Sequence, residues 1–540
     1  MIKQENKVMR TLSQWIHQKK ESFNLTVFAL QIFSFSAFIA LLINIWTNSP
    51  NLILTHDVVD FIAEANQFLL DKTLYSSFFN INPPFLIIFY VVWGFLFGFG
   101  LYGLKILNII LVMGIFLVFY KILLKSGYNK LSLVVFNVAV ALTYTRNAFQ
   151  MFLPSESIGT LIALVCLYLS LGGSEKFINL VSVGILSALA MQTKEVYAFV
   201  ILTPILVCFL HQKPRYSRLG VLLTSFVGTN LILALTLHHF NELDSYWDVI
   251  TLKSERFGLS DWKNTAFTVF VMLYRQLQLL GEVFFIFFIL VISLAVYNFS
   301  RGPKRDSSQV TKNKNSFILK GVGVNWIATF IGVIWQNNDF SVGRVLITIL
   351  FPFLLFVYFG LVNLFSYICL DKLHLRIACL VMISTLLFSI YSRNYYKPAD
   401  LTDQQIDRSS KNYTIVNNLN LPSNACIQNA YGWMSGGAYL YTGIKPCSRY
   451  FLLNLIIKDS LRLNEFKWNM VSHPPSAIIY DNSDADLDWQ EFEHNFFDYS
   501  KILKNCYLNV PDSDVYVARF LVLSQSKCIR NEIGAQKLID

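Results

Sequence analysis

The stretch THDVVDFIAEANQFLLDKTLYSSFFNINPPFLIIFYVVWGFLFG, residues 55–98, decides how this sequence is organised. It begins with an amphipathic helix pattern that starts at Asp57, and it contains a turn at Tyr75. Pro83-Pro84 then opens a second, strongly aromatic run. The apolar positions of the first helix are Phe61, Ala65, Phe68 and Leu69. We expect two interfacial helices here, with the apolar face of the first one turned toward the membrane.

The chain around this stretch has the composition of a polytopic membrane protein. Of its 540 residues, 54% are hydrophobic and 14% are charged, whereas soluble domains carry about 25% charged residues. The 47 Phe, 26 Tyr and 10 Trp exclude a disordered chain. The net charge of +10 fits the basic cytoplasmic loops of a membrane protein. We therefore expect membrane lipids as partners and no nucleic acid.

Apolar runs of sufficient length predict about eleven transmembrane helices. The first covers residues 25–46, after a basic amphipathic segment (1–23) that we expect on the cytoplasmic surface. The others fall near 104–124, 131–149, 155–172, 176–192, 196–210, 219–239, 265–298, 317–336, 341–366 and 374–391. We assign residues 24–392 to a transmembrane domain whose first outer loop is 47–103.

Charge decides the status of residues 83–100, which are apolar but ambiguous as a span. If they do not cross the membrane, the basic clusters lie on the same side as the basic N-terminus, in agreement with the positive-inside rule. Those clusters are Lys121/Lys125/Lys130, Lys213/Arg215/Arg218, 301–314 and Lys372/Arg376. This reasoning predicts a cytoplasmic N-terminus and an extracytoplasmic C-terminus.

The same topology brings five polar segments to the outer face. They are residues 47–82, 153–156, 192–195, 240–264 and 336–344. Because they come from spans scattered along the chain, their convergence predicts a shared site.

From residue 393 the long apolar runs stop, and 393–540 is predicted to be a small soluble α/β domain. Strands are expected near 477–480 and 515–520, and helices over 450–463 and 488–503. The four cysteines of this part allow three pairings, of which Cys426–Cys447 and Cys506–Cys528 are the most local. Unpaired buried thiols are the alternative.

The residue order in 55–98 resembles the first outer loop of the GT-C superfamily of integral-membrane glycosyltransferases. The likeness is to the branch with protein O-mannosyltransferases, lipid A aminoarabinose transferases and bacterial relatives. Asp57 falls on the catalytic aspartate of that family, Phe61 on a tyrosine position and Pro83-Pro84 on a diproline. Val58 replaces a common second acid, which makes Asp60 a rival for part of its role.

Weaker likenesses follow along the chain. Glu156 stands where relatives place a carboxylate at the start of a span, and Lys194 where many have a lysine before a span containing proline. Gly343-Arg344 resembles a late segment in which Val345 here replaces tyrosine. Residues 439–443 and 448–450 resemble the outer domain of bacterial relatives.

The resemblance implies an inverting glycosyltransferase of a bacterial inner (plasma) membrane. It would move a sugar from a polyprenyl-phosphate donor to a hydroxyl of an envelope glycan, lipid or protein at the extracytoplasmic face. Asp57, with Asp60 as rival, is the candidate base. Lys194 and Arg344 are candidates to hold the phosphate. Asp60 and Glu156 could orient hydroxyls, and Tyr75 is a further candidate for binding substrate.

Each candidate residue also has a purely structural interpretation. Asp57 and Asp60 could cap a helix, and Glu156 could favour a helix N-terminus. Lys194 and Arg344 could extend to lipid headgroups. His56 beside Asp57 could help to bind a divalent cation, but an ordinary loop histidine explains it as well, and no metal site is predicted.

Two other functions remain open at this stage. A transporter or flippase of lipid-linked or small solutes would suit the number of spans, although no internal repeat is visible. A non-catalytic GT-C relative would suit the missing second acid.

Overall fold

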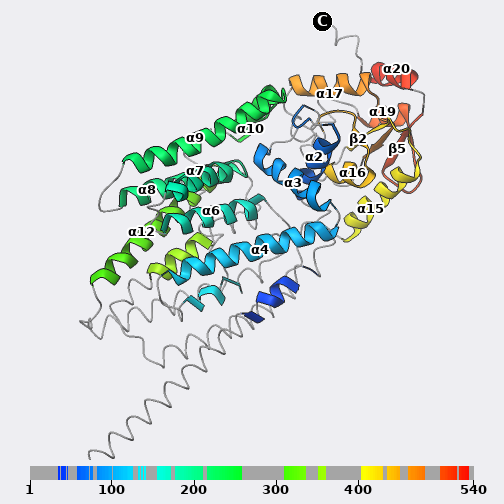
Figure 1. Cartoon of the computed structure of the whole chain (residues 1–540). Helices are drawn as coiled ribbons and strands as arrows, with labels where there is room; N and C mark the ends of the chain where they lie inside the picture. The colour runs from blue at the N-terminus through cyan, green and yellow to red at the C-terminus, as the bar shows by residue number, and fades with distance from the viewer. Residues whose placement is uncertain are drawn as a thin grey trace, which may run out of the picture.

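The computed structural model describes residues 35–46, 57–125, 132–140, 155–257, 309–335, 351–360, 403–480 and 499–533, apart from short gaps within these ranges. Long helices lie side by side at one end of the molecule, and a small sheet with its own helices lies at the other (Figure 1). The predicted segment 1–23 and the predicted spans 265–298 and 374–391 fall outside the described residues.

The helices of the bundle follow the apolar runs of the sequence. They are α4 (Leu101–Leu124), α6 (Ser155–Leu171), α7 (Phe177–Met191), the 3-10 helix η2 (Glu195–Ile201), α8 (Leu202–Leu210), α9 (Tyr216–His239) and α12 (Gln309–Trp335). A further helix, Phe351–Gly360, falls within the predicted span 341–366. Each of these expected helices is present. The total of eleven spans stays a prediction.

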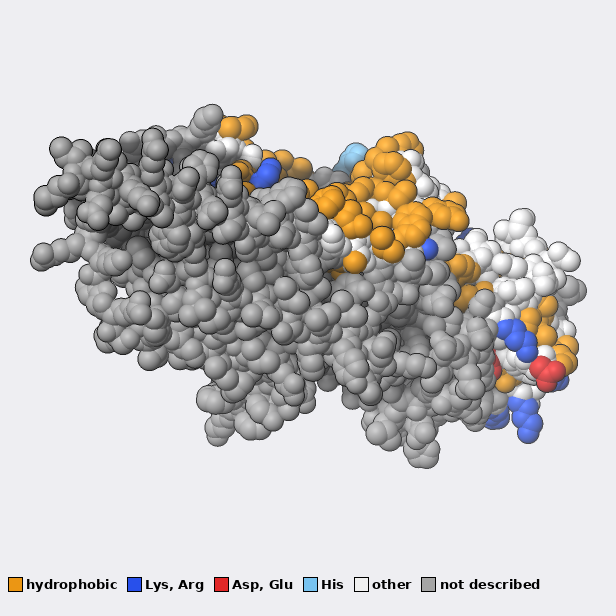
Figure 2. Space-filling view, turned by 90° about the horizontal axis from the view of Figure 1, so that it is seen from below, with side chains coloured by type: hydrophobic (Ala, Val, Ile, Leu, Met, Phe, Trp, Pro, Cys, Tyr) orange, Lys and Arg blue, Asp and Glu red, His pale blue; other side chains and the backbone are white. Residues whose placement is uncertain are grey.

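Two of the described helices, Tyr102–Leu124 and Tyr216–His239, are long and apolar enough to cross a membrane. Large apolar side chains are exposed along α9, including Val227, Leu231, Ile232 and Leu235. Figure 2 shows one hydrophobic area of this kind on a face of the molecule. Exposed apolar surface of this extent is typical of contact with a membrane or with another protein.

The first outer loop contains the two expected short helices, α2 (Asp57–Asp71) and α3 (Pro84–Phe97). Pro83 is extended and Pro84 occupies the first helical turn, where a proline costs no hydrogen bond. Gly98 ends α3 with a φ of 72°, a conformation that favours glycine.

The predicted orientation of α2 toward the membrane is wrong for Phe61 and Ala65. Both are buried in the protein core, and the Phe61 ring lies 5.9 Å from that of Tyr90 in α3. Phe68 is partly buried against the same core. The apolar face of α2 packs on protein because α3 and the C-terminal part of the chain cover it.

Five strands form the sheet in the order β2-β1-β3-β5-β4. The strands are β1 (Cys426–Asn429), β2 (Lys445–Pro446), β3 (Ala477–Ile479), β4 (Tyr507–Asn509) and β5 (Val515–Ala518). β1 pairs in parallel with β2 and β3, and β5 pairs antiparallel with β3 and β4. The fully buried β3 and its neighbour β5 confirm the two predicted strands.

The helices around the sheet are α15 (Asp403–Asn418), α16 (Ser435–Thr442), α17 (Ser460–Ser472), α19 (Tyr499–Cys506) and α20 (Val522–Ile533). Of the helix expected over 450–463, residues 460–463 lie in α17, which begins at Ser460, whereas 451–459 fall outside the described residues. Tyr450 enters the core, and its backbone N–H donates to Ser448 Oγ at 3.2 Å. The helix expected over 488–503 is described only from Tyr499 on.

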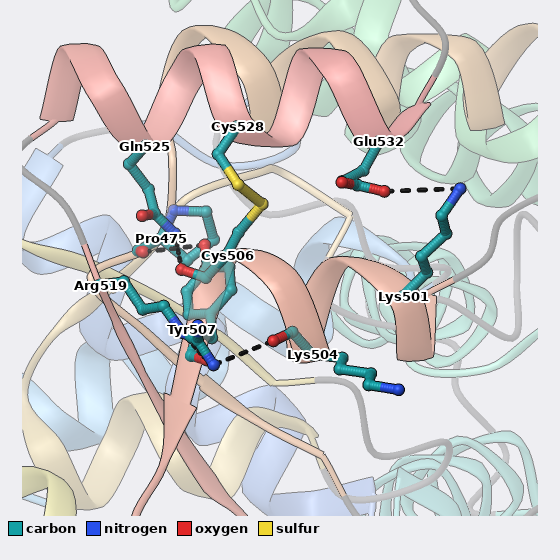
Figure 3. The surroundings of a disulfide bond; sticks show 9 residues. All are labelled: Pro475, Lys501, Lys504, Cys506, Tyr507, Arg519, Gln525, Cys528 and Glu532. Carbon is teal, nitrogen blue, oxygen red and sulfur yellow. Dashed lines mark hydrogen bonds and ion pairs between the residues drawn. A yellow bond between two sulfur atoms is a disulfide. The ribbon is translucent and has the colours of Figure 1, made fainter.

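Both favoured disulfides are present. Cys426–Cys447 ties β1 to the end of β2, and Cys506–Cys528 ties α19 to α20 (Figure 3). Beside the second bond, Arg519 Nε donates to the Tyr507 carbonyl at 2.6 Å, and Gln525 donates to the Cys506 carbonyl at 2.8 Å. These contacts fix the two helices against the sheet edge.

The C-terminal part of the chain shares its hydrophobic core with the first outer loop. One cluster combines Ile62 of α2 and Tyr90 of α3 with Phe466 of α17. A second combines Ala63 of α2 with Ile427 and Ile479 of the sheet. The helix that begins at Asp57 is thus held between α3 and the C-terminal part, at the end of the bundle (Figure 1).

Candidate functional site

Four of the five polar segments predicted to converge contact one another in pairs: 153–156 contacts 192–195, and 47–82 contacts 240–264. The backbone N–H of Leu86, in the first turn of α3, donates to the carbonyl of Gln192 at 3.2 Å. The side chain of Gln192 in turn donates to Asn230 of α9 at 2.9 Å. The starts of α3 and η2 therefore lie together. The fifth segment, 336–344, falls outside the described residues, and Arg344 with it.

Glu156 and Lys194 form an ion pair at this end of the bundle. Glu156 lies in the first turn of α6 and its side chain is 3% exposed, while the side chain of Lys194, just before η2, is 23% exposed. The two residues were expected to contact substrate separately. The hairpin of α6 and α7 brings them together, and the pairing compensates the burial of the carboxylate.

Tyr197 supports this ion pair from η2. Its hydroxyl donates to the backbone carbonyl of Glu156 at 2.7 Å and lies 2.8 Å from the hydroxyl of Thr160. Gly159 leaves the space for the ring, since a Cβ there would come within 2.1 Å of it. The start of α6 is thereby fixed to η2.

A second buried carboxylate, Glu242, was not recognised from the sequence. It lies between α9 and α10 (Leu243–Phe257) and is 1% exposed. Its two oxygens accept hydrogen bonds from the backbone N–H groups of Leu74 (2.9 Å), Tyr75 (2.8 Å) and Ser76 (2.9 Å), and from the Ser76 hydroxyl (2.6 Å). Segment 240–264 is thus bound to the first outer loop.

Tyr75 is fully buried in that turn. Its hydroxyl donates to the Asn82 carbonyl at 2.7 Å, and its ring lies 5.2 Å from that of Tyr246 in α10. In this arrangement Tyr75 fixes the shape of the loop. Its predicted contact with substrate stays a prediction.

The two candidate bases lie on α2. Asp57 is the first residue of the helix, and Asp60, one turn further on, is buried at 5% exposure. Asp60 faces α16 of the C-terminal part, where its carboxylate acts on Tyr439. Burial is the main cause that raises the pKa of Tyr439, and the Asp60 carboxylate adds to the rise.

Helix α10 also contacts the C-terminal part. Asp248 forms an ion pair with Arg462 of α17, and Arg449 lies 3.5 Å from the same carboxylate. Arg449 is also bound by both oxygens of Glu465, at 2.9 and 2.8 Å. The pairing of Asp248 with Arg462 carried no signal in the sequence, because the two residues are far apart along the chain, whereas Arg449 lies in the stretch 448–450 that resembled the outer domain of relatives.

No group of three or more His, Cys, Asp or Glu side chains that could hold a metal ion occurs within the described part of the chain. His56 lies outside that part. The suggestion of a divalent cation beside Asp57 therefore stays untested.

The fold of the chain matches that of two solved membrane glycosyltransferases. One is ArnT from Cupriavidus metallidurans bound to undecaprenyl phosphate, with a TM-score of 0.52 and 12% identity over 82% of this chain and 92% of that one. The other is the oligosaccharyltransferase of Archaeoglobus fulgidus in complex with Zn and sulfate. Its TM-score is 0.51 and its identity 11%, over 90% of this chain and 73% of that one.

No protein-family profile and no curated protein matches the sequence. At such low identity, the structural matches show the fold alone. Both solved proteins belong to the GT-C superfamily, so the resemblance first noticed in the outer loop is confirmed for the fold. The chain has the helical fold of these proteins, and two of its described helices are long and apolar enough to cross a membrane.

Proposed function

We propose that this protein is a membrane glycosyltransferase that takes its sugar from a polyprenyl-phosphate donor. The observation that carries this proposal is the GT-C architecture, matched over most of this chain by an ArnT that binds undecaprenyl phosphate. At one end of the helices, α2 packs on the C-terminal part, and the start of α3 lies beside the turn that carries Lys194. That end holds acids and a cation of the kinds that the reaction needs.

The chemistry can be assigned to residues as follows. Asp57 takes the proton from an acceptor hydroxyl as that oxygen attacks the anomeric carbon, and the lipid phosphate leaves with the bonding electron pair. One displacement inverts the configuration, and no covalent glycosyl-enzyme intermediate forms. Lys194 and Arg344 stabilise the phosphate that leaves. Asp60 and Glu156 act on hydroxyls of sugar or acceptor, and Tyr75 shapes the loop between α2 and α3.

The topology completes the proposal. Residues 1–23 lie on the cytoplasmic surface, 24–392 form the transmembrane domain and 393–540 lie on the extracytoplasmic side of a bacterial inner membrane. Two disulfides in the C-terminal part support this side, because disulfides persist in oxidising compartments. The acceptor is a glycan, lipid or protein of the cell envelope.

The test is transfer of radiolabel from a panel of polyprenyl-phosphate sugars to envelope acceptors by the purified, reconstituted protein. We expect Asp57→Asn to lower the rate by about 10²- to 10⁴-fold, the contribution usual for general base catalysis. Asp512→Asn is the matched control, since Asp512 is exposed in a turn of the C-terminal part and its positive φ of 57° suits asparagine.

Two results would contradict parts of the proposal. Transfer that survives in Asp57→Asn but is lost in Asp60→Asn would assign the base to Asp60. Absence of transfer from every donor to every envelope fraction would reject the polyprenyl-phosphate chemistry.

A further inference from the structure

We propose that Glu242 is a positioning residue that holds the first outer loop in its working place. The inference rests on the proposed function, because α2 of that loop begins with the candidate base Asp57. The carboxylate of Glu242 contacts the turn at residues 74–76, and we expect it to act through that turn.

The turn at residues 74–76 binds the Glu242 carboxylate mainly through its backbone N–H groups. Three successive N–H groups, of Leu74, Tyr75 and Ser76, point at one carboxylate, and the Ser76 hydroxyl adds a fourth donor. Successive backbone N–H groups of a turn form a concave site for an anion. Glu242 fills this site from a segment far away in sequence, so the turn depends on a tertiary contact for its shape.

The backbone around Glu242 is itself fixed. Asn241 takes a left-handed conformation (φ 57°) at the end of α9, and the N–H of Glu242 donates to the Leu237 carbonyl at 2.9 Å. The Glu242 carbonyl accepts from the N–H of Tyr246, also at 2.9 Å, and the Tyr246 ring packs on Tyr75. The carboxylate is thus presented from a defined corner between two helices.

Helix α10 connects this contact to the C-terminal part. Six residues after Glu242, within α10, Asp248 pairs with Arg462 and lies near Arg449. The segment is therefore bound to the outer loop by one acid and to α17 by another. A displacement of the turn would move the end of α2 and, through the Tyr75–Asn82 hydrogen bond, the approach to α3.

A carboxylate is the right group for this task. Among the described residues, no lysine or arginine pairs with Glu242, so the four donors provide its whole compensation. A glutamine would present an N–H₂ group toward donors that need an acceptor. Glu242→Gln should therefore release at least half of the contact while it preserves the size of the side chain.

The test is hydrogen exchange of the full-length protein in lipid nanodiscs, followed by mass spectrometry. Glu242→Gln is compared with Asp244→Asn, which removes a charge from an exposed position two residues later. We expect exchange in peptides that cover residues 73–76 to rise by about tenfold or more in Glu242→Gln only, with α17 and α20 unchanged. Ser76→Ala, which keeps the three backbone donors, should give a smaller rise at the same place and serves if Glu242→Gln does not fold.

The functional arm measures sugar transfer by the same variants. A displaced catalytic loop should lower kcat by about 10- to 100-fold and change the donor KM by less than about threefold. Unchanged exchange at 73–76, or a rise spread equally over α17 and the sheet, would overturn the proposal, as would a normal kcat in a variant whose turn is released. If the wild-type protein transfers no sugar, the proposed function fails, whereas the exchange contrast still decides whether Glu242 holds the turn.

Discussion

Two buried carboxylates at the same end of the helices are compensated in different ways. Glu156 at the start of α6 is paired with the ammonium group of Lys194. Glu242 before α10 is surrounded by four neutral donors of one turn. Counted over the whole residue, Glu156 is 2% exposed and Glu242 is 1% exposed. Burial of a carboxylate costs free energy unless the charge is paired or hydrogen-bonded, and the two sites offset this cost with different partners.

The ion pair leaves a charge that another anion can attract. Lys194 retains partial exposure, so we expect a phosphate to compete with Glu156 for its ammonium group, in line with the role proposed for it. The backbone donors of residues 74–76 have no such freedom, because they are fixed in one turn. The comparison suggests a rearrangeable site around Glu156 and a fixed anchor around Glu242.

The largest change in the free energy of unfolding is expected when Lys194, the cation paired with Glu156, is removed. Lys194→Met should lower the free energy of unfolding by about 3 kcal/mol, because it leaves a buried carboxylate without its counter-ion. The double variant Lys194→Met/Glu156→Gln should regain more than half of the loss. The measurement is SDS-induced unfolding of the detergent-solubilised protein. Additive effects of the two substitutions would show that the pair contributes no coupling energy.

A smaller loss is expected when the support of Glu156 is disturbed without a change of charge. Gly159→Ala would place a methyl group within 2.1 Å of the Tyr197 ring and force it away from the Glu156 carbonyl. We expect a loss of about 2 kcal/mol in the same unfolding assay. Gly228→Ala in α9 is the matched control, since no atom lies within 4 Å of its new methyl group. Equal stability of both variants would contradict the described packing of Tyr197.

Removal of one hydrogen-bond donor from Glu242 should lower the free energy of unfolding by less than the two changes at Glu156. Ser76→Ala removes the hydroxyl and leaves three backbone hydrogen bonds, so we expect about 1 kcal/mol by the same unfolding assay. A loss as large as that of Lys194→Met would show that the hydroxyl, and not the backbone, holds Glu242.

The smallest change in the free energy of unfolding is expected for an exposed ion pair. Lys501 and Glu532 lie 3.5 Å apart beside the Cys506–Cys528 bond, and the Lys501 side chain is 56% exposed (Figure 3). Lys501→Ala should change the free energy of unfolding by less than about 0.5 kcal/mol, because solvent screens the pair. A clear destabilisation would mean that charge, rather than burial, dominates the other results as well.

The sequence predicted those features that depend on local pattern. Long apolar runs located α4, α6, α7 and α9 to within a few residues, and the Pro83-Pro84 pair marked the start of α3. The alternation in 515–520 identified β5. Strands β1, β2 and β4 were not predicted. Strands β3 and β5 are no longer than these, at three and four residues, but they lie within the β-like runs 477–480 and 515–520, which made them recognisable.

Tertiary contacts could be predicted from the sequence only in part. Glu156 and Lys194 were both recognised as candidates, but their mutual pairing follows from the α6–α7 hairpin and not from either residue. Glu242 was not singled out because most of its partners are backbone N–H groups. Every residue except proline carries such a group, so the side chains of residues 74–76 give no signal of the contact. The direction of α2 was wrong for Phe61, since an amphipathic helix fits a membrane surface and a protein core equally well.

The core that joins α2 to the sheet also sets an order of events during synthesis. Ala63 shares a core with Ile427, Ala477 and Val515, which the ribosome adds long after the loop itself. At about 5–20 residues per second, the loop waits roughly 20 to 90 seconds for these partners. The nascent protein therefore displays a helix with an uncovered apolar face until its last segment arrives. Its assembly is vulnerable to proteases and in need of chaperones during that interval.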